Sequence, residues 1–470
     1  MELSDDILVL KNLVISLLAK VEELTKENAI LKAENIELRQ RLGINSGNSS
    51  LPPSKDLYKI KPALTKLSKG KQGGQVGHTG KTLLKIQNPD KVVVLLPNVC
   101  SCGYNLKSTP STLKQSRQVF DLPQPKLEVT EYQQYACVCP NCSQEVKGSF
   151  PSEVTNGVQY GSGVMALCSL LSSSFHLSCQ QISQLFTDLF DQPLNGATVI
   201  TANARTYKAL ENSENIIREQ LLAARTTHFD ETGIACEKNN YWLHTACNNL
   251  FTYLFVHSKR GLEALKSEQS LLADFTNWAI HDCWVSYFSF EKMQHALCNA
   301  HLLRELQALI ENNSQWATKM HQLLLNLYYL SDNGKGVVVD LSPHLILYQQ
   351  ICQEANLEEP PPIKSKRGRS KSSKGRNLLN RLLEHQDSVL AFAKYEHIPF
   401  TNNLAERSIR PVKSKIKIAG CFRSKAGADH FARIQGFVAT ARKHSHSVFK
   451  ELKNAYQGFT FIESTYQVAK

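Results

Sequence analysis

Apolar residues near the start of the chain recur in alternating steps of three and four. The a positions of this heptad pattern are Ile7, Val14, Val21, Asn28, Asn35 and Leu42, and the d positions are Leu10, Leu17, Leu24, Leu31 and Leu38. β-Branched residues at a with Leu at d favour two parallel strands, and a buried Asn at a fixes their register. The pattern predicts a leucine-zipper coiled coil over residues 1–43, which would make the protein a homodimer. The alternative is an amphipathic helix packed on its own domain.

The heptads stop at residue 43, where Ser, Asn, Gly and Pro predominate. The stretch GINSGNSSLPPSKD has too few apolar residues to order itself, and the following KLSKGKQGGQVGHTGKT is basic and rich in Gly. We predict a flexible basic linker over residues 44–98. It either lies along a phosphate backbone or is a solvated tether.

Five of the 13 cysteines fall within residues 100–142. The CPNC turn gives Cys139 and Cys142 a spacing that aims two thiolates at one tetrahedral zinc, whereas Cys100 and Cys102 have the less usual spacing of one intervening residue. We predict a small structural Zn²⁺ module over residues 99–150 with these four ligands, and with Cys137 as a spare ligand. The alternative is a group of reduced structural thiols.

Residues 151–218 carry apolar positions at helical spacing. The pattern predicts helices over 160–175, 178–190 and about 196–210, with the turn DQPLN between the second and the third. Two helices joined by a short turn are typical of a DNA-reading helix-turn-helix, although other helical bundles contain the same hairpin. We predict a helical, helix-turn-helix-like DNA-binding region.

From residue 219 the pattern changes to strands. TTHFDET, NYWLHTACN and LFTYLFVHSKRG predict three strands, followed by a helix over about 262–275 and a strand in NWAIHDCWVSYF. This order is that of an α/β ribonuclease H-like fold, in which the first strand and the strand after the helix are neighbours. We predict such a catalytic domain over residues 219–470, with a helical insertion at about 300–400.

Two acids stand at or near the ends of neighbouring strands of this predicted sheet. Asp230 follows the short strand-like segment that begins at Thr226, and Asp282 ends the fourth strand. We therefore expect the two carboxylates to meet. Because successive strand residues face opposite sides of a sheet, Glu231 should point away from Asp230, to solvent or to a basic neighbour.

A third acid comes from FTNNLAERSIRPVKSK, residues 400–415. Asn402 or Asn403 can cap a helix that holds Glu406 in its first turns and that Pro411 ends or kinks. Three such carboxylates suit a pair of Mg²⁺ or Mn²⁺ ions that cleave a phosphodiester. A basic run follows, and we predict that it contacts DNA: Arg407, Arg410, Lys413, Lys415 and Lys417.

Composition indicates the class of partner. The 54 Lys and Arg exceed the 42 Asp and Glu, and the resulting +12 favours nucleic acid. The acidic start MELSDD is unlike a secretory signal, and no apolar run approaches the roughly 18 to 20 residues that span a bilayer. We expect a soluble, intracellular protein without membrane contact. The basic loop at 364–376 either grips phosphates or is a solvated charge run.

Several long motifs make the chain resemble a transposase of the insertion sequence 66 family, within the Asp-Asp-Glu recombinases. They are NSGNSSLPPS, GGQVGHTGKT, HFDETG, IHDCWVSY, CNAHLLREL and NNLAERSIRP, together with the zipper-like start and the paired cysteines. The resemblance covers nearly the whole chain and implies that Asp230, Asp282 and Glu406 form a catalytic triad. It also matches Cys298 and His301 to a Cys-x-x-His element of several such families. These two residues either support the active site directly or form a packed helix start beneath it.

The resemblance implies a function as well. Such a transposase would cleave double-stranded DNA at the terminal repeats of an insertion sequence and join the freed 3′ hydroxyl to target DNA. Accessory proteins encoded by the element would be further partners, and the location would be the bacterial cytoplasm, at the nucleoid. One alternative is a catalytically inactive, dimeric, zinc-containing DNA-binding regulator. Another is a ribonuclease H-like nuclease that acts in repair or on RNA.

Overall fold

A five-stranded mixed sheet organises much of the chain in this computed structural model, which describes residues 11–25, 27, 83–362 and 372–466. The strands, in the order β5-β4-β3-β6-β7, are β3 Thr226–Cys236, β4 Asn239–Cys247, β5 Thr252–His257, β6 Trp278–His281 and β7 Gln294–Leu297. β3, β4 and β5 pair antiparallel, whereas β6 runs parallel to β3 and β7 parallel to β6. The predicted adjacency of the first strand and the strand after the first helix is confirmed.

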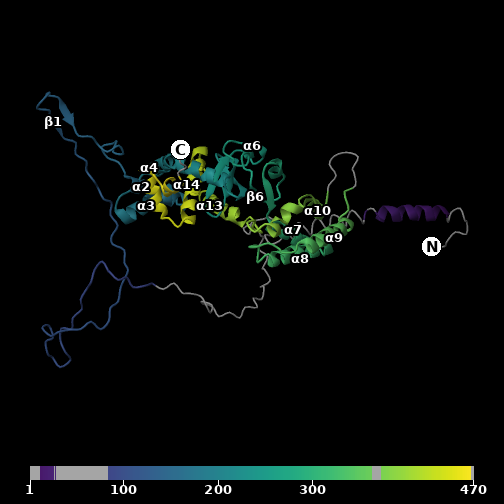
Figure 1. The fold of residues 1–470 in the computed structure, drawn as a ribbon, viewed down its shortest axis with the longest axis horizontal. Helices are drawn as coiled ribbons and strands as arrows, with labels where there is room; N and C mark the ends of the chain where they lie inside the picture. Colours follow the sequence, from purple (N-terminus) through teal and green to yellow (C-terminus); the bar gives the residue numbers. More distant parts are fainter. Residues whose placement is uncertain (1–10, 26, 28–82, 363–371, 467–470) are drawn as a thin grey trace. The chain divides into compact units, whose positions relative to one another are not determined.

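The described residues divide into two compact units. The larger contains the described residues of Met1–Leu57, Pro151–Leu185 and Pro193–Lys470, and the smaller contains those of Tyr58–Phe150 and Phe186–Gln192. Figure 1 colours the sheet and the helices around it from teal to yellow. No helix in the described ranges is long and apolar enough to cross a membrane.

Helix α13 Asn403–Ala419 covers one face of the sheet. Its buried residues Ala405, Ile409 and Val412 follow steps of four and three, which places them on one side of the helix. Ile409 and Val412 share a core with apolar residues of the three antiparallel strands, among them Ile234. The helix continues through Pro411 to Ala419, so this proline does not end it.

A second core joins helices from both ends of the larger unit. The helices are α2 Ser162–Ser173, α4 Gly196–Ala209, α5 Glu211–Leu222, α14 Lys425–Lys443, α15 Val448–Ala455 and α16 Phe461–Tyr466. Their apolar residues pack with Phe229 and Phe255 of the sheet. The helices predicted at 160–175, 178–190 and 196–210 correspond to α2, α3 Cys179–Phe190 and α4. Helices α2 and α4 of the predicted helix-turn-helix-like region therefore share a core with the sheet and the C-terminal helices.

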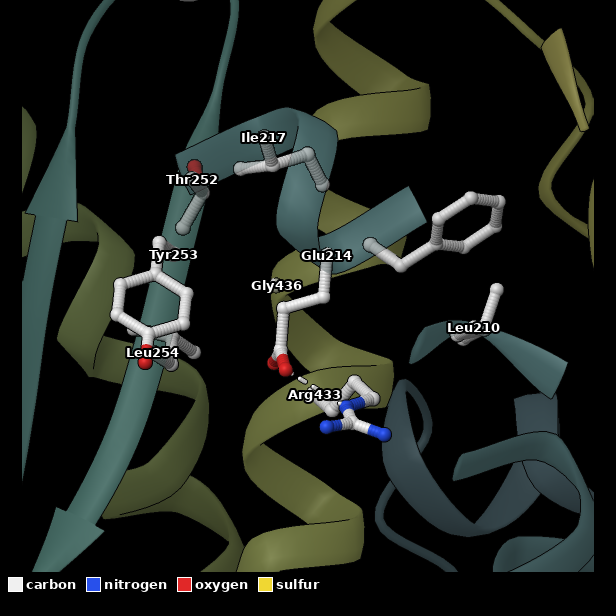
Figure 2. Close-up of a pocket in the computed structure, with 9 residues that line it drawn as sticks. Leu210, Glu214, Ile217, Thr252, Tyr253, Leu254, Arg433 and Gly436 are labelled. Carbon is white, nitrogen blue, oxygen red and sulfur yellow. Dashed lines mark hydrogen bonds and ion pairs between the residues drawn. The ribbon is translucent and has the colours of Figure 1, made fainter. Parts of the chain in front are cut away.

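Helix α14 approaches the edge strand β5 very closely. A side chain at Gly436 would bring its Cβ to 3.1 Å from the backbone oxygen of Thr252. Thr440, one turn later, accepts a hydrogen bond of 3.0 Å from the Thr252 N–H. Figure 2 shows this packing, with Glu214 of α5 reaching Arg433 of α14, where Nε donates to Oε2 over 2.8 Å. A side-chain hydroxyl and an ion pair thus hold α14 and α5 beside this edge of the sheet.

The segment between the last two predicted acids is mainly helical, as the sequence pattern predicted for about 300–400. It contains α7 Asn299–Ile310, α8 Gln315–Leu330, α9 Ser342–Glu358, α10 Lys374–Glu384, α11 Gln386–Val389 and α12 Ala391–Lys394. These helices bury a core of their own, which includes Trp316 and Tyr348. This core continues onto the sheet through Ile280 of β6 and Leu297 of β7.

The helix predicted over 262–275 is wrong in its length. Only α6 Leu262–Leu265 forms. The next residues turn instead, because their serines bond to nearby backbone: Ser267 Oγ donates to the Ala264 oxygen, and Ser270 Oγ accepts from the Leu272 N–H. Serine side chains that bond locally in this way compete with a continuing helix.

Residues 11–25 of the predicted zipper are helical. The heptad residues within this stretch are all at least half exposed: Val14 51%, Leu17 56%, Val21 59% and Leu24 51%. The remaining heptad positions, including both asparagines, lie outside the described residues. Of the predicted linker over 44–98, residues 83–98 are described and contain no helix or strand.

Candidate active site

Asp230 lies on β3, and Asp282 is the residue directly after β6, the neighbouring parallel strand. The last pair in the β3–β6 ladder is His228 opposite Ile280. Asp230 comes two residues later in β3, and Asp282 comes two residues after Ile280, directly after β6 ends at His281, which fits the expectation that they approach one another. β3 itself continues to Cys236, paired with β4, so Asp230 lies within its strand rather than near its end.

Helix α13 is fixed to β3 at both ends, and this fixes the position of Glu406. At the start, the Asn402 side chain donates 2.7 Å to the Phe229 oxygen and lies 2.8 Å from Nδ1 of His228. Beyond the far end, the Phe422 N–H donates to a backbone oxygen of β3 over 2.9 Å. Glu406 lies four residues after Asn402, about one helical turn. The first turn of α13, which carries Glu406, therefore lies beside the part of β3 that carries Asp230.

Asn402 has a different role from the one expected. It holds the N-cap position of α13, but its side chain makes no capping bond to the helix. It instead joins β3 to the start of α13, while its own N–H donates to Cys298 Sγ over 3.1 Å. Sequence reasoning missed this function. The only available signal was that Asn402 belongs to the long motif NNLAERSIRP.

The electrostatics of Asp230 reflect the other acids. Burial raises its pKa well above the usual aspartate value, and the charge of Glu231 raises it further. Asp282 and Glu406 add to this rise, so both of the other predicted catalytic acids lie within electrostatic reach of Asp230. One of the Asp230 oxygens, Oδ1, accepts a hydrogen bond of 2.8 Å from the Glu231 N–H. A cluster of hard oxygen ligands under mutual repulsion fits a divalent cation such as Mg²⁺ or Mn²⁺.

The closest set of ligand atoms combines one of these acids with the Cys-x-x-His pair. In the described ranges, Cys298, His301 and Glu406 form the one group of three or more Cys, His, Asp or Glu residues whose ligand atoms all lie within 4.8 Å of one another. The three predicted catalytic acids do not form such a group. Cys298 is buried at the N-cap of α7, and burial raises its pKa to about 11. His301 Nε2 lies 3.9 Å from Glu406 Oε1.

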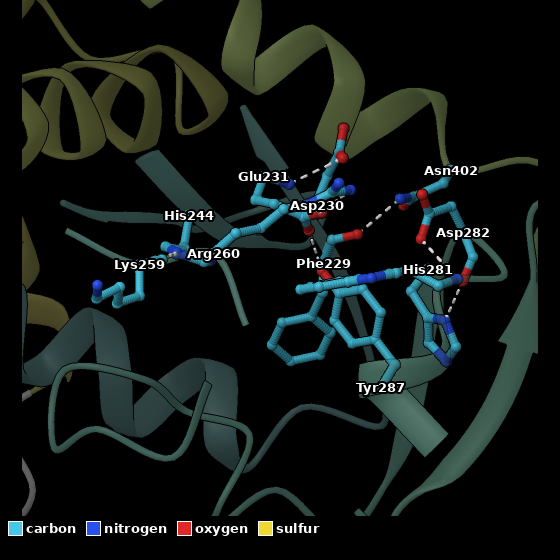
Figure 3. Close-up of polar contacts among 11 residues, drawn as sticks. Phe229, Asp230, Glu231, His244, Lys259, Arg260, His281, Asp282, Tyr287 and Asn402 are labelled. Carbon is cyan, nitrogen blue, oxygen red and sulfur yellow. Dashed lines mark hydrogen bonds and ion pairs between the residues drawn. The ribbon is translucent and has the colours of Figure 1, made fainter. Parts of the chain in front are cut away.

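Glu231 points away from Asp230 and meets a basic neighbour, one of the two outcomes expected. Its side chain is 2% exposed, which excludes the alternative of a solvent-facing acid. Arg260 donates to Glu231 Oε1 through Nε and Nη2 at 2.9 and 2.7 Å, and the Tyr287 hydroxyl donates to Oε2 at 2.6 Å (Figure 3). The guanidinium also lies over the rings of Trp242 and Trp284, at 5.0 and 4.4 Å. This supporting network was not predicted.

Most of the predicted DNA contacts are available on one stripe of α13. The exposed members are Arg407, Arg410, Lys413 and Lys417. Steps of three and four place them on the same side of the helix. Lys415 lies elsewhere: its Nζ donates to the Ser172 oxygen of α2 over 3.2 Å, and burial lowers its pKa.

The basic loop at 364–376 is described only from residue 372 onward. There the Ser373 hydroxyl accepts from the Arg376 N–H and so caps α10. The Arg376 guanidinium donates 2.6 Å to the Asn356 side chain. The end of the predicted loop is therefore the start of a helix.

The predicted zinc ligands lie on two tight turns of the smaller unit. Cys139 follows strand β1 Ala136–Val138, and its N–H bonds across the turn to the Gln144 oxygen at 2.8 Å, before strand β2 Glu145–Lys147. Cys100 begins a similar turn, in which its N–H bonds to the Tyr104 oxygen at 2.9 Å. Cys137, the spare ligand, lies in β1.

Each turn directs backbone N–H groups at its first thiol. The Cys102 N–H is the main cause of the lowered pKa of Cys100, and the Cys142 N–H is the main cause of the lowered pKa of Cys139. A lowered pKa favours the thiolate that zinc requires. The four sulfur atoms are not gathered within 4.8 Å in the described structure, so the shared zinc site stays a prediction.

The order and directions of the strands are consistent with a ribonuclease H-like fold. The model of the family described as "Transposase IS66 family" matches residues 157–430, which is more than half of the chain. The protein belongs to this family, as the sequence motifs indicated. No curated protein matches the chain. Membership of a transposase family supports a DNA-processing enzyme.

Proposed function

We propose that this protein is a metal-dependent DNA transposase that cleaves strands at the ends of an insertion sequence and joins them to target DNA. The observation that carries the proposal is the convergence on Asp230. Asp282 directly follows β6, the strand parallel to β3, and the start of α13 is bonded to β3 with Glu406 in the first turn of the helix. The charges of both acids act on the Asp230 carboxyl.

Asp230, Asp282 and Glu406 would hold the Mg²⁺ or Mn²⁺ ions. When bound, such a pair of ions activates the attacking oxygen and stabilises the leaving one. The protein groups supply position. Asn402 fixes the start of α13, and the exposed basic stripe beyond Glu406 offers charges to the phosphates of the bound strand.

The remaining parts of the chain fit DNA-end recognition in this proposal. The zipper pairs two subunits, so that both element ends are held in one complex. The cysteine module binds structural Zn²⁺ and, with the helical region before β3, contacts the terminal repeats. The protein works on bacterial DNA in the cytoplasm, at the nucleoid, with accessory proteins of the element as further partners.

Zinc analysis of the full chain tests the cysteine module. Cys139→Ser should contain one zinc ion fewer per chain than Cys421→Ser. Equal zinc contents in the two variants would exclude the module.

Strand cleavage on a duplex with an element end, in the presence of Mg²⁺, tests the proposed function. The wild type should cut at that end and join the product to a second duplex, and Asp282→Asn should do neither while still binding the DNA. Asp274→Asn is the matched control, since Asp274 is exposed and outside the acidic cluster. Binding without cleavage by the wild type would instead indicate an inactive regulator. Equal cleavage of duplexes without an element end would indicate a general nuclease.

A further inference from the structure

Three side chains of different chemistry meet beside the proposed catalytic site. The sulfur of Cys298, an imidazole nitrogen of His301 and a carboxylate oxygen of Glu406 all lie within 4.8 Å of one another. Two of these residues come from the start of α7 and the third from the start of α13. The proposed catalytic function requires only Glu406, so the proximity of the other two has no explanation in it.

Backbone geometry holds this group together. Cys298 and His301 are three residues apart at the N-terminus of α7, so both face the same side of its first turn, and the His301 N–H bonds to the Cys298 oxygen. The Asn402 N–H donates to Cys298 Sγ, which places the first turn of α13 against the same thiol. The group is therefore built from two anchored helix starts.

Two of the polar atoms in this group have no hydrogen-bond partner. His301 Nδ1 and Glu406 Oε1 are buried and unpaired, and the 3.9 Å between His301 Nε2 and Glu406 Oε1 is too long for a hydrogen bond. Buried polar atoms in folded proteins are seldom left without a partner. A metal ion bound by His301 through Nδ1 and by Glu406 through Oε1 would satisfy both atoms.

The kind of metal follows from the ligand atoms. Mg²⁺ prefers oxygen alone, whereas one thiolate, one imidazole and one carboxylate form a set suited to Zn²⁺, with water as the fourth ligand. We propose that Cys298, His301 and Glu406 form a Zn²⁺ site separate from the cysteine module. When Zn²⁺ occupies this site it coordinates the Glu406 carboxylate. Glu406 is then unavailable to bind the catalytic ions together with Asp230 and Asp282, so strand cleavage is inhibited. The inhibition of cleavage rests on the proposed function, whereas the binding of Zn²⁺ by the three residues does not.

Cobalt binding tests the site without any DNA. Full-length protein stripped of metal is titrated with Co²⁺, and the thiolate-to-cobalt absorption is followed. The wild type should bind one more equivalent of Co²⁺ than Cys298→Ser or His301→Asn. In Cys298→Ser, the thiolate-to-cobalt absorption should also be weaker than in the wild type. Cys352→Ser, a buried cysteine in the core of the insertion, is the matched control and should keep the full stoichiometry.

Equal cobalt stoichiometry in the wild type and in both variants would overturn the proposal. Cys298→Ser retains an acceptor for the Asn402 N–H, and His301→Asn leaves that bond untouched, so the second variant decides the question if the first does not fold. Thermal unfolding by circular dichroism shows whether each variant is folded.

Cleavage assays test the inhibition. For each protein, the rate with Mg²⁺ is measured with and without added Zn²⁺, and only the ratio of the two rates is compared. The wild type should lose most of its activity with Zn²⁺ and regain it with a chelator, whereas His301→Asn should give a ratio near one. The same ratio in both proteins would overturn the inhibitory role. If the wild type never cuts DNA, the proposed function fails, and the cobalt titration still decides whether the zinc site exists.

Discussion

Asp230 carries a partly buried carboxyl group among three other acids, and this gives the protein a distinctive pH dependence. Its pKa is raised by burial first and then by the neighbouring charges. The folded, metal-free protein thus keeps this proton at a higher pH than the unfolded chain does. The free energy of unfolding should therefore fall as pH rises from the ordinary aspartate pKa through the raised one.

Asp230→Asn should remove this decline, because an amide does not titrate. We expect the melting temperature of the variant, relative to the wild type, to increase as pH rises above the ordinary aspartate pKa. Buried His228 and His244, whose pKa is lowered to about 4 by burial, affect both proteins alike at acid pH. Excess Mg²⁺ should stabilise the wild type and reduce the difference, since it binds the ionised form. A difference that does not change with pH would contradict this account.

Asn402 is the residue that joins the two halves of the site. Asn402→Ala removes the partner of the Phe229 oxygen and of His228 Nδ1. Leaving such buried groups unpaired costs about 1–3 kcal/mol, which urea unfolding would detect. Because the start of α13 also loosens, half-maximal cleavage should require more Mg²⁺. Asn403→Ala, at an exposed neighbouring position, should change neither quantity, and a shift of the same size in both variants would argue against a specific role.

Helix α14 and strand β5 show how an element pair depends on one glycine. A Cβ at Gly436 would lie 3.1 Å from the Thr252 oxygen, so the larger side chain of Gly436→Val must push the helix from the strand. We expect a loss of about 1–3 kcal/mol in the free energy of unfolding, the usual cost of overpacking. Chemical denaturation measures it.

Ala426→Val is the control for this prediction. It adds bulk to the same helix at an exposed position. Its effect should be limited to the small difference in helix propensity. Equal losses in the two variants would mean that helix propensity, and not the contact with β5, determines the outcome.

At the scale of the whole molecule, the described part of the N-terminal helix carries an exposed apolar stripe. Val14, Leu17, Val21 and Leu24 are each about half exposed on the N-terminal helix. If two chains pair through this stripe, as we propose, light scattering should give twice the chain mass of 52.7 kDa. Leu17→Lys places a charge at a d position and should shift the protein toward the monomer.

Ala19→Lys is the matched control for the zipper, because it introduces the same side chain at an outward f position of the heptad. It should leave the mass unchanged. A monomeric wild type would exclude the zipper, and a Leu17→Lys protein that stays dimeric would place the dimer contact on another surface.

Local pattern was sufficient for much of this protein. Heptad spacing predicted the N-terminal helix, alternation and strand order predicted the neighbours β3 and β6, and long motifs indicated the family. Strand alternation also separated Asp230 from Glu231. These features depend on residues close together in the sequence, where periodicity and turn chemistry dominate.

Contacts between residues that are far apart in the sequence could not be predicted from local pattern. The bond from Asn402 to Phe229 joins positions 173 residues apart, and the Arg260 and Tyr287 partners of Glu231 come from two further segments. Local serine bonds shortened α6 against its helical pattern. The meeting of Cys298, His301 and Glu406 likewise required the starts of α7 and α13 to lie together, because the order of residues along a chain does not specify which helix starts will touch.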